Sequence, residues 1–173
     1  MARSFLLCLC IFMATPLSAA PVKSKPRPVV GWVEKVMLED VSITLKARMD
    51  TGAGLSSVDA EIVQLIPSEG KGKPERTIFQ VKDEHGETKT LERDIVKWIN
   101  IKKKGADGFI RRPVVRMDFC LGGKKIEGRV NLAERSGFLY PLLIGRNILK
   151  TGDFLIDPTR TFTHKPGCGV AKK

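Results

Sequence analysis

Apolar and polar residues alternate along most of the chain beyond residue 28. From Ile43 to Met49 every second side chain is apolar, and the residues between them are polar or charged. This period of two is typical of a strand that is buried on one face. The pattern returns in residues 31–38, 77–81, 88–96, 114–120, 125–133 and 153–158. Many short strands with glycine-containing turns between them predict an all-β barrel or sandwich.

Helical patterns are few. The segment GRNILKTG, residues 145–152, predicts one short helix that ends at Gly152. Residues 59–67 predict a further helical turn before Pro67. The segment DEHGE, residues 83–87, separates two strand patterns and predicts a hairpin. Such a hairpin is a candidate flap over a binding cleft, although a hairpin on the outside of any barrel would show the same pattern.

The first twenty residues have the layout of a secretory signal peptide. Arg3 precedes an apolar run from Phe5 to Met13, and small residues follow. This run is shorter than a membrane-spanning helix. We therefore expect a signal peptide (1–20), a flexible proline-rich tether (21–28), one domain (29–165) and a C-terminal tail (166–173). The expected product is periplasmic or secreted and has no membrane span after cleavage.

Export changes how the cysteines and histidines are interpreted. Only Cys120 and Cys168 remain after cleavage, and an oxidising compartment favours a disulfide between them over two free thiols. The two histidines, His85 and His164, form no cluster with the spacing of metal ligands. The residues therefore predict no metal site.

The chain is basic, with 30 lysine and arginine residues against 19 aspartate and glutamate residues and a net charge of +11. A basic surface attracts nucleic acid, anionic lipid or acidic peptides, and it also keeps an exported protein soluble. Few aromatic residues accompany the basic clusters, so the sequence lacks the stacking platform of single-strand nucleic-acid binders. We expect no specific nucleic-acid site.

The strand pattern that begins near Ile43 leads directly into Asp50, Thr51, Gly52 and Ala53. The glycine lets the backbone turn tightly and brings its N–H towards the carboxylate. Two carboxylates held in contact share one proton, and such a pair acts as base towards water and as acid towards a leaving amine. Asp-Thr-Gly alone fits an ordinary turn equally well, because all three residues are frequent in turns.

A second motif, PLLIGRNIL at residues 141–149, predicts an apolar strand followed by a helix. Together with KARMDTGAGLSSVDA, RRPVV, LAERSGFLY and FLIDPTRTF, it is similar to a retropepsin-like bacterial family labelled ATP-dependent zinc proteases. Some members of that family are encoded near glutamate ligases of the RimK type. The resemblance covers roughly residues 30–160 and implies a retropepsin-like acid-protease barrel of a single lobe, with one short helix.

The resemblance implies an aspartic peptidase that works as a homodimer. The chain has one Asp-Thr-Gly, so a pair of aspartates requires a second copy, with both loops at a two-fold axis. The implied catalytic residues are Asp50, Thr51 and Gly52, where Thr51 links the two loops and Gly52 and Ala53 shape the floor. The implied structural motif is Leu143, Ile144, Gly145 and Arg146.

The family label implies zinc and ATP, which the residues do not support. The chain has neither a glycine-rich phosphate loop nor a His-Glu-x-x-His motif. We therefore expect no cofactor. Asp59 stands where the family often has histidine, and we expect it to be a surface or capping carboxylate.

Several arginines in the matching segments are candidate substrate-binding residues, since guanidinium groups bind carboxylates in bidentate fashion. With the glutamate-ligase association, they favour an acidic, glutamate-rich peptide as substrate. Two other interpretations stay open: a non-catalytic module that binds an anionic ligand, and a metal-dependent protease. The arginines are Arg48, Arg112, Arg116 and Arg135.

Overall fold

The computed structural model describes residues 25–103, 105 and 107–168. The predicted signal peptide, the first part of the tether and the end of the tail lie outside these residues. The fold is all-β with one short helix, as predicted. Its strands are β1 (Val29–Leu38), β2 (Ile43–Met49), β3 (Ser56–Asp59), β4 (Glu61–Ile66), β5 (Arg76–Lys82), β6 (Thr88–Asp94), β7 (Lys97–Lys102), β8 (Phe109–Leu121), β9 (Lys124–Ala133), β10 (Leu142–Ile144) and β11 (Leu155–Thr161); α1 is Arg146–Thr151, and a 3-10 turn, η1, spans Glu39–Val41.

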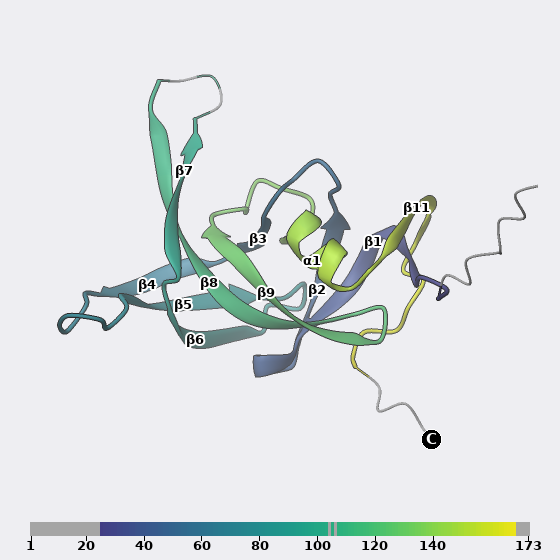
Figure 1. The fold of residues 1–173 in the computed structure, drawn as a ribbon, viewed down its shortest axis with the longest axis horizontal. Helices are drawn as coiled ribbons and strands as arrows, with labels where there is room; N and C mark the ends of the chain where they lie inside the picture. Colours follow the sequence, from purple (N-terminus) through teal and green to yellow (C-terminus); the bar gives the residue numbers. More distant parts are fainter. Residues whose placement is uncertain (1–24, 104, 106, 169–173) are drawn as a thin grey trace, which may run out of the picture.

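The strands form a barrel and a smaller sheet beside it. The large sheet has the order β11-β1-β2-β10-β3-β9-β8-β7. It closes on itself because β1 also pairs with β8 at Met37 and Leu38. Strands β4, β5 and β6 form a second, three-stranded sheet, which projects from one side of the barrel (Figure 1).

The alternation in the sequence is visible in the burial of β2. Ile43, Leu45, Ala47 and Met49 are buried, and the residues between them are exposed or half-buried. Because successive side chains of a strand point to opposite faces, one face of β2 lines the barrel core. The apolar face thus carries the chain to Asp50 at the end of the strand.

The helix α1 confirms the prediction for residues 145–152 and packs on β9. Ile148 and Leu149 are its buried residues. Gly128 of β9 allows this close approach, because a Cβ atom there would lie only 2.6 Å from Cγ1 of Ile148. This packing fixes the position of α1, which follows β10 and Gly145 directly.

The predicted helical turn at residues 59–67 is wrong, since β4 occupies this segment. Its backbone pairs antiparallel with β5, from Glu61 opposite Gln80 to Ile66 opposite Arg76. The segment contains Ile62, Val63 and Ile66, and β-branched residues favour strands over helices. Pairing with β5 therefore outweighs the weak helical pattern.

The predicted hairpin at residues 83–87 is present, but its turn lies on the outside of the barrel. Glu84 forms ion pairs with Lys46 of β2 at 2.5 Å and with Lys35 of β1 at 3.7 Å. A hydrogen bond from Lys46 lowers the pKa of Glu84. The hairpin that extends away from the barrel is instead β7–β8 (Figure 1).

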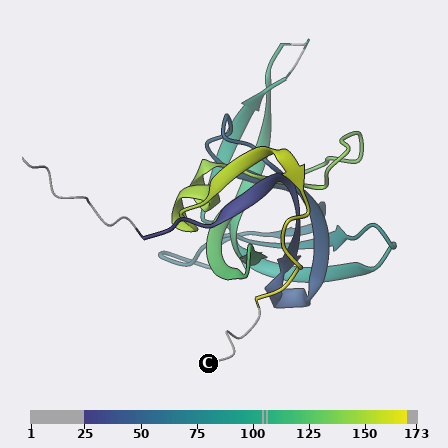
Figure 2. The same cartoon turned by 90° about the vertical axis from the view of Figure 1, so that its right-hand side faces the viewer.

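The C-terminal segment is attached to the barrel at two places. Glu34 of β1, fully buried, accepts hydrogen bonds from the backbone N–H of Thr163 at 3.1 Å and of Gly31 at 2.6 Å. Beyond β11, which runs parallel to β1 (Figure 2), the chain ends its described part in the predicted Cys120–Cys168 disulfide. Within the described residues, no helix is both long and apolar enough to cross a membrane.

Candidate active site

The loop of residues 50–55, called here the Asp50 loop, holds its own carboxylate. The backbone N–H of Asp50 donates to the carbonyl of Ile144 at 2.8 Å. Oδ1 of Asp50 accepts the N–H of Gly52 at 2.9 Å and of Ala53 at 3.1 Å. Among the described residues nothing donates to Oδ2 of Asp50, so this oxygen is available to a water or to a second carboxylate. Thr51 and Gly52 are exposed.

The strand β10 lies between the two strands that enter and leave the Asp50 loop. It runs between β2 and β3, with Leu143 opposite both Arg48 and Ser57. Gly145 follows, and a Cβ atom there would meet the carbonyl carbon of Leu55 at 2.8 Å. Only glycine fits at this crossing of two backbones, which explains the Leu-Leu-Ile-Gly motif in packing terms.

Arg146 clamps the loop from the side. Its backbone N–H donates to the carbonyl of Ala53 at 2.8 Å. Its Nη1 donates to the carbonyls of Thr51 at 2.8 Å and of Gly52 at 2.7 Å. Three successive carbonyls of the loop are therefore bound by one residue, which fixes the path of the backbone around Asp50.

A polar network beneath the loop was not predicted. The Oδ1 atom of Asn147 accepts both the N–H and the hydroxyl of Ser56 at 2.9 Å, and Ser56 Oγ in turn accepts the N–H of Gly145 at 2.9 Å. Asn131 of β9 donates to the Ser56 carbonyl at 2.7 Å and accepts from Ser57 at 3.2 Å. The signal for it was present, since two serines follow a glycine loop directly into a buried strand.

Removing the guanidinium of Arg146 tests this clamp. We expect Arg146→Met to lower the free energy of unfolding, because losing a charged donor to two carbonyls costs on the order of 1.5–3 kcal/mol. Arg116→Met is the matched control, since Arg116 pairs with Glu127 on an exposed part of the β8–β9 hairpin. Urea unfolding of the purified proteins measures both, and equal losses in the two variants would contradict a specific role.

Asp59 and Arg135 fasten the loop of residues 134–141 to the end of β3. Oδ1 of Asp59 accepts the N–H of Arg135 at 2.5 Å, which confirms the expected capping role. The guanidinium of Arg135 donates to the carbonyl of Tyr140 at 3.3 Å and stacks on the ring of Phe138 at 4.5 Å. Most of the Arg135 side chain is thus used within its own loop.

Several charged side chains act on Arg135. Burial lowers the pKa of Arg135, with the nearby guanidinium groups of Arg112 and Arg48 adding to the effect and the carboxylates of Asp59 and Asp50 opposing it. The charges of Arg48, Arg112, Asp59 and Asp50 thus all act on Arg135. The structure does not bring Arg116 to this group, because its guanidinium lies 2.6 Å from Glu127.

The described residues do not fit a zinc site. Their one close group of ligand-type side chains is Glu39 with Cys120 and Cys168, and both thiols of that group are consumed in the disulfide. A disulfide sulfur has no thiolate to offer a metal. We therefore expect no metal ion to take part in the chemistry of this site.

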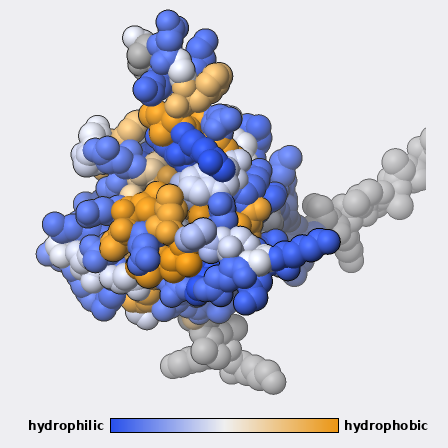
Figure 3. Space-filling model, turned by 90° about the vertical axis from the view of Figure 1, so that its left-hand side faces the viewer, coloured by the Kyte–Doolittle hydropathy of each residue, from blue (hydrophilic) through white to orange (hydrophobic). Residues whose placement is uncertain are grey.

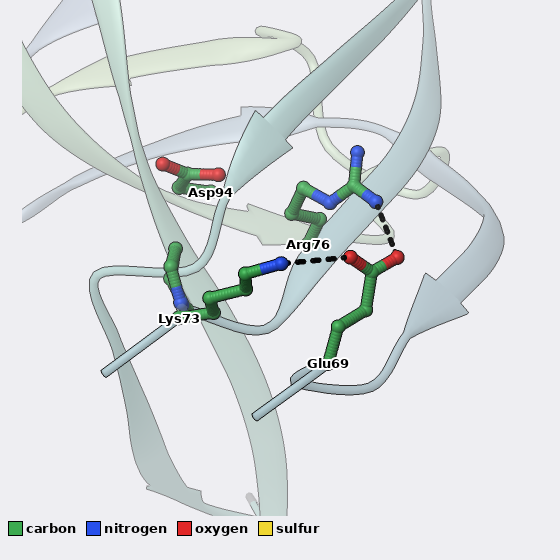
Figure 4. Close-up of a pocket in the computed structure, with 5 residues that line it drawn as sticks. Glu69, Lys73, Arg76 and Asp94 are labelled. Atoms are coloured by element: carbon green, nitrogen blue, oxygen red, sulfur yellow. Dashed lines mark hydrogen bonds and ion pairs between the residues drawn. The ribbon is translucent and has the colours of Figure 1, made fainter. Parts of the chain in front are cut away.

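A small hollow of about 180 Å³ lies at the turn between β4 and β5. Glu69 forms ion pairs there with Lys73 at 3.6 Å and Arg76 at 3.4 Å, while Asp94 lies opposite (Figure 4). These charges neutralise one another, and the turn between β4 and β5 lies away from the loop that joins β2 to β3 (Figure 1). It contributes nothing to the chemistry of Asp50.

Comparison with known proteins gives one family. The family described as "Retropepsin-like aspartic endopeptidase RimB" matches residues 29–166. A crystal structure of Lpg0085, a Legionella pneumophila protein of unknown function, aligns with a TM-score of 0.66 and 36% identity, covering 81% of this chain and 100% of that one. The solution structure of simian foamy virus (mac) protease aligns with a TM-score of 0.35 and 14% identity, over 68% of this chain and 91% of that one.

Two curated relatives are longer proteins. They are named probable alpha-L-glutamate ligases, from Shewanella pealeana and Shewanella halifaxensis, and are 27% and 26% identical over 118 residues. The matched part is 68% of this chain and 25% of each ligase. The chain therefore spans about a quarter of the length of these relatives.

Proposed function

Since the chain belongs to the RimB-like family of retropepsin-like aspartic endopeptidases, we propose that it hydrolyses peptide bonds with a water molecule activated by a pair of Asp50 carboxylates. The observation that carries the proposal is the Asp50 loop itself. One carboxylate oxygen is fixed by the N–H groups of Gly52 and Ala53, and the other faces no donor among the described residues. Family membership supports peptidase chemistry at this loop.

The second carboxylate comes from a second copy of the chain. In the proposed homodimer the two Asp50 loops meet at the two-fold axis and share one proton, because adjacent carboxylates cannot both ionise. The ionised carboxylate takes a proton from the water molecule as the water oxygen attacks the peptide carbonyl carbon. The protonated one then supplies a proton to the leaving amine. The exposed Thr51 is placed to link the two loops.

The proposed substrate is an acidic, glutamate-rich peptide. Support comes from Arg48 and Arg112, whose charges act on Arg135 together with that of Asp50, and from the position of Arg48 two residues before Asp50. Arg135 is largely occupied by Tyr140 and Phe138, which leaves Arg48 and Arg112 as the groups to receive substrate carboxylates. The similarity to proteins named glutamate ligases agrees with a glutamate-containing substrate.

The dependence of KM on peptide charge and on salt concentration tests this substrate class. We expect an oligoglutamate peptide to have a KM several-fold lower than a matched oligoglutamine peptide, and the advantage to shrink when salt is raised from 50 to about 500 mM, since exposed charges are screened. Arg112→Gln should reduce the advantage, and Arg116→Gln is the control. Equal KM values for the two peptides at low salt would rule out recognition by these arginines.

We also propose that the protein acts after export, in the periplasm or outside the cell. The layout of residues 1–20 supports this location. The Cys120–Cys168 disulfide supports it as well, because structural disulfides persist mainly in oxidising compartments.

A further inference from the structure

A groove of about 720 Å³ lies beside the Asp59–Arg135 contact, and Asp59 is one of its lining residues. Its apolar lining residues, called here the floor, are Ala60, Ile62 and Val81. Its carboxylates, called here the rim, are those of Asp59, Glu61 and Glu134, and Lys82 is the one basic residue of the lining. In a chain whose net charge is +11, the groove therefore has an excess of acidic groups.

The strand that forms one wall of the groove has a free edge. Within the described residues β4 pairs only with β5, so its other edge presents unpaired backbone groups. Three of its apolar side chains are exposed: Ile62 by 39%, Val63 by 56% and Leu65 by 49%. Apolar side chains gather over the end of the β4–β5–β6 sheet (Figure 3). Exposed apolar patches of this kind mark binding surfaces, and a free strand edge binds extended peptides.

The groove begins one short strand away from the candidate active site. Asp59 lines the groove and is the last residue of β3, whose four residues follow the Asp50 loop directly. At about 3.3 Å per residue, a strand of four residues spans only about 10 Å. An extended polypeptide bound at the Asp50 loop can therefore reach the groove within a few residues.

The acidic rim argues against a second copy of the chain as the occupant. In a two-fold contact the same patch faces itself, so the three rim carboxylates of one copy would find Lys82 as the one basic partner in the lining of the other copy. Like charges in an interface oppose association. A peptide with lysine or arginine beside an apolar residue satisfies both the rim and the floor.

We propose that this groove is an exosite that binds an extended segment of the substrate polypeptide, a few residues from the scissile bond, with an apolar side chain on the floor and a lysine or arginine at the rim. The inference rests on the proposed function, since it assigns the groove to the same substrate. The preferred substrate is then bipartite: acidic where it is cleaved, and apolar and basic beside it.

Two peptides test the exosite. Both carry the same oligoglutamate core; one continues through a Gly-Ser spacer into Val-Lys-Val-Lys, and the other into Gly-Ser-Gly-Ser. We expect the first to have a KM about tenfold lower, as burial of one or two apolar side chains would give. In Ile62→Arg the ratio of the two KM values should fall to about one. Leu65→Arg, on the same strand but outside the groove lining, should keep it near ten.

Binding without cleavage separates the exosite from the peptidase activity. Fluorescence anisotropy with Asp50→Asn protein measures the affinity of both peptides. If neither peptide is cleaved by the wild type but the Ile62-dependent difference in affinity is present, the exosite stands and the peptidase proposal falls. If the core is cleaved and the extension changes neither KM nor affinity, the exosite alone is overturned. It is also overturned if Ile62→Arg converts a dimer to a monomer in sedimentation, since the groove would then be a contact between copies.

Discussion

Asp50→Asn is expected to lower kcat/KM by at least about a thousandfold, the upper part of the range for general acid–base catalysis. An amide cannot take a proton from water, and two amides at the axis cannot share one. The side-chain oxygen of asparagine can still accept the N–H groups of Gly52 and Ala53, which bind Oδ1 of Asp50 in the structure. The loop should therefore keep its shape while losing its chemistry.

Thermal unfolding and sedimentation provide the controls for Asp50→Asn. The melting temperature and the dimer fraction should stay close to those of the wild type, because no packing contact is removed. If the asparagine variant, dimeric and folded, retains peptidase activity, the water is activated by another group and the proposed mechanism is wrong.

Gly145→Ala is expected to reduce both stability and activity. A Cβ atom at this position would lie 2.8 Å from the carbonyl carbon of Leu55 and 3.0 Å from the carbonyl oxygen of Ala53. Both are backbone atoms of the Asp50 loop, which cannot move aside as a flexible side chain would. We expect the free energy of unfolding to fall by about 1–3 kcal/mol, and kcat to fall more than tenfold as the loop is displaced.

Gly137→Ala is the matched control for this change. An added Cβ at Gly137 would have no heavy atom within 4 Å, so the effect should stay within about 0.5 kcal/mol. Urea unfolding and peptide hydrolysis measure both variants. A Gly145→Ala protein with wild-type stability and activity would contradict the close crossing of β10 beneath the Asp50 loop.

Much of the barrel could be predicted from the period of two, because its longer strands bury one face. The alternation in β2 continues in the burial of the whole strand, and in β8 it continues from Val115 to Phe119. The last residues of β8 and β9, such as Cys120 and Asn131, are buried on both faces and break the alternation. Besides β4, two strands were missed for physical reasons. β3 has four residues and begins with two serines, while β7 is largely exposed. Neither has an apolar face long enough to produce a periodic pattern.

The contacts that position the candidate site could not be predicted from the sequence. Asp50 and the Leu-Leu-Ile-Gly motif were identified from their residues, but the bond from Arg146 to Gly52 joins residues 94 positions apart. The bond from Arg135 to Asp59 spans 76 positions. Such contacts depend on how the loops pass over the barrel, and no local pattern records that path.

In the proposed mechanism two copies of the chain combine their Asp50 carboxylates into one site. The distance between those carboxylates, in an experimental structure of the protein bound to a non-hydrolysable oligoglutamate peptide, tests this pairing directly. We expect a two-fold dimer in which the nearest carboxylate oxygens of the two Asp50 residues lie within hydrogen-bonding distance, about 2.5–3.0 Å. A monomer bound to the peptide, or a dimer with the two Asp50 loops on separate faces, would contradict it.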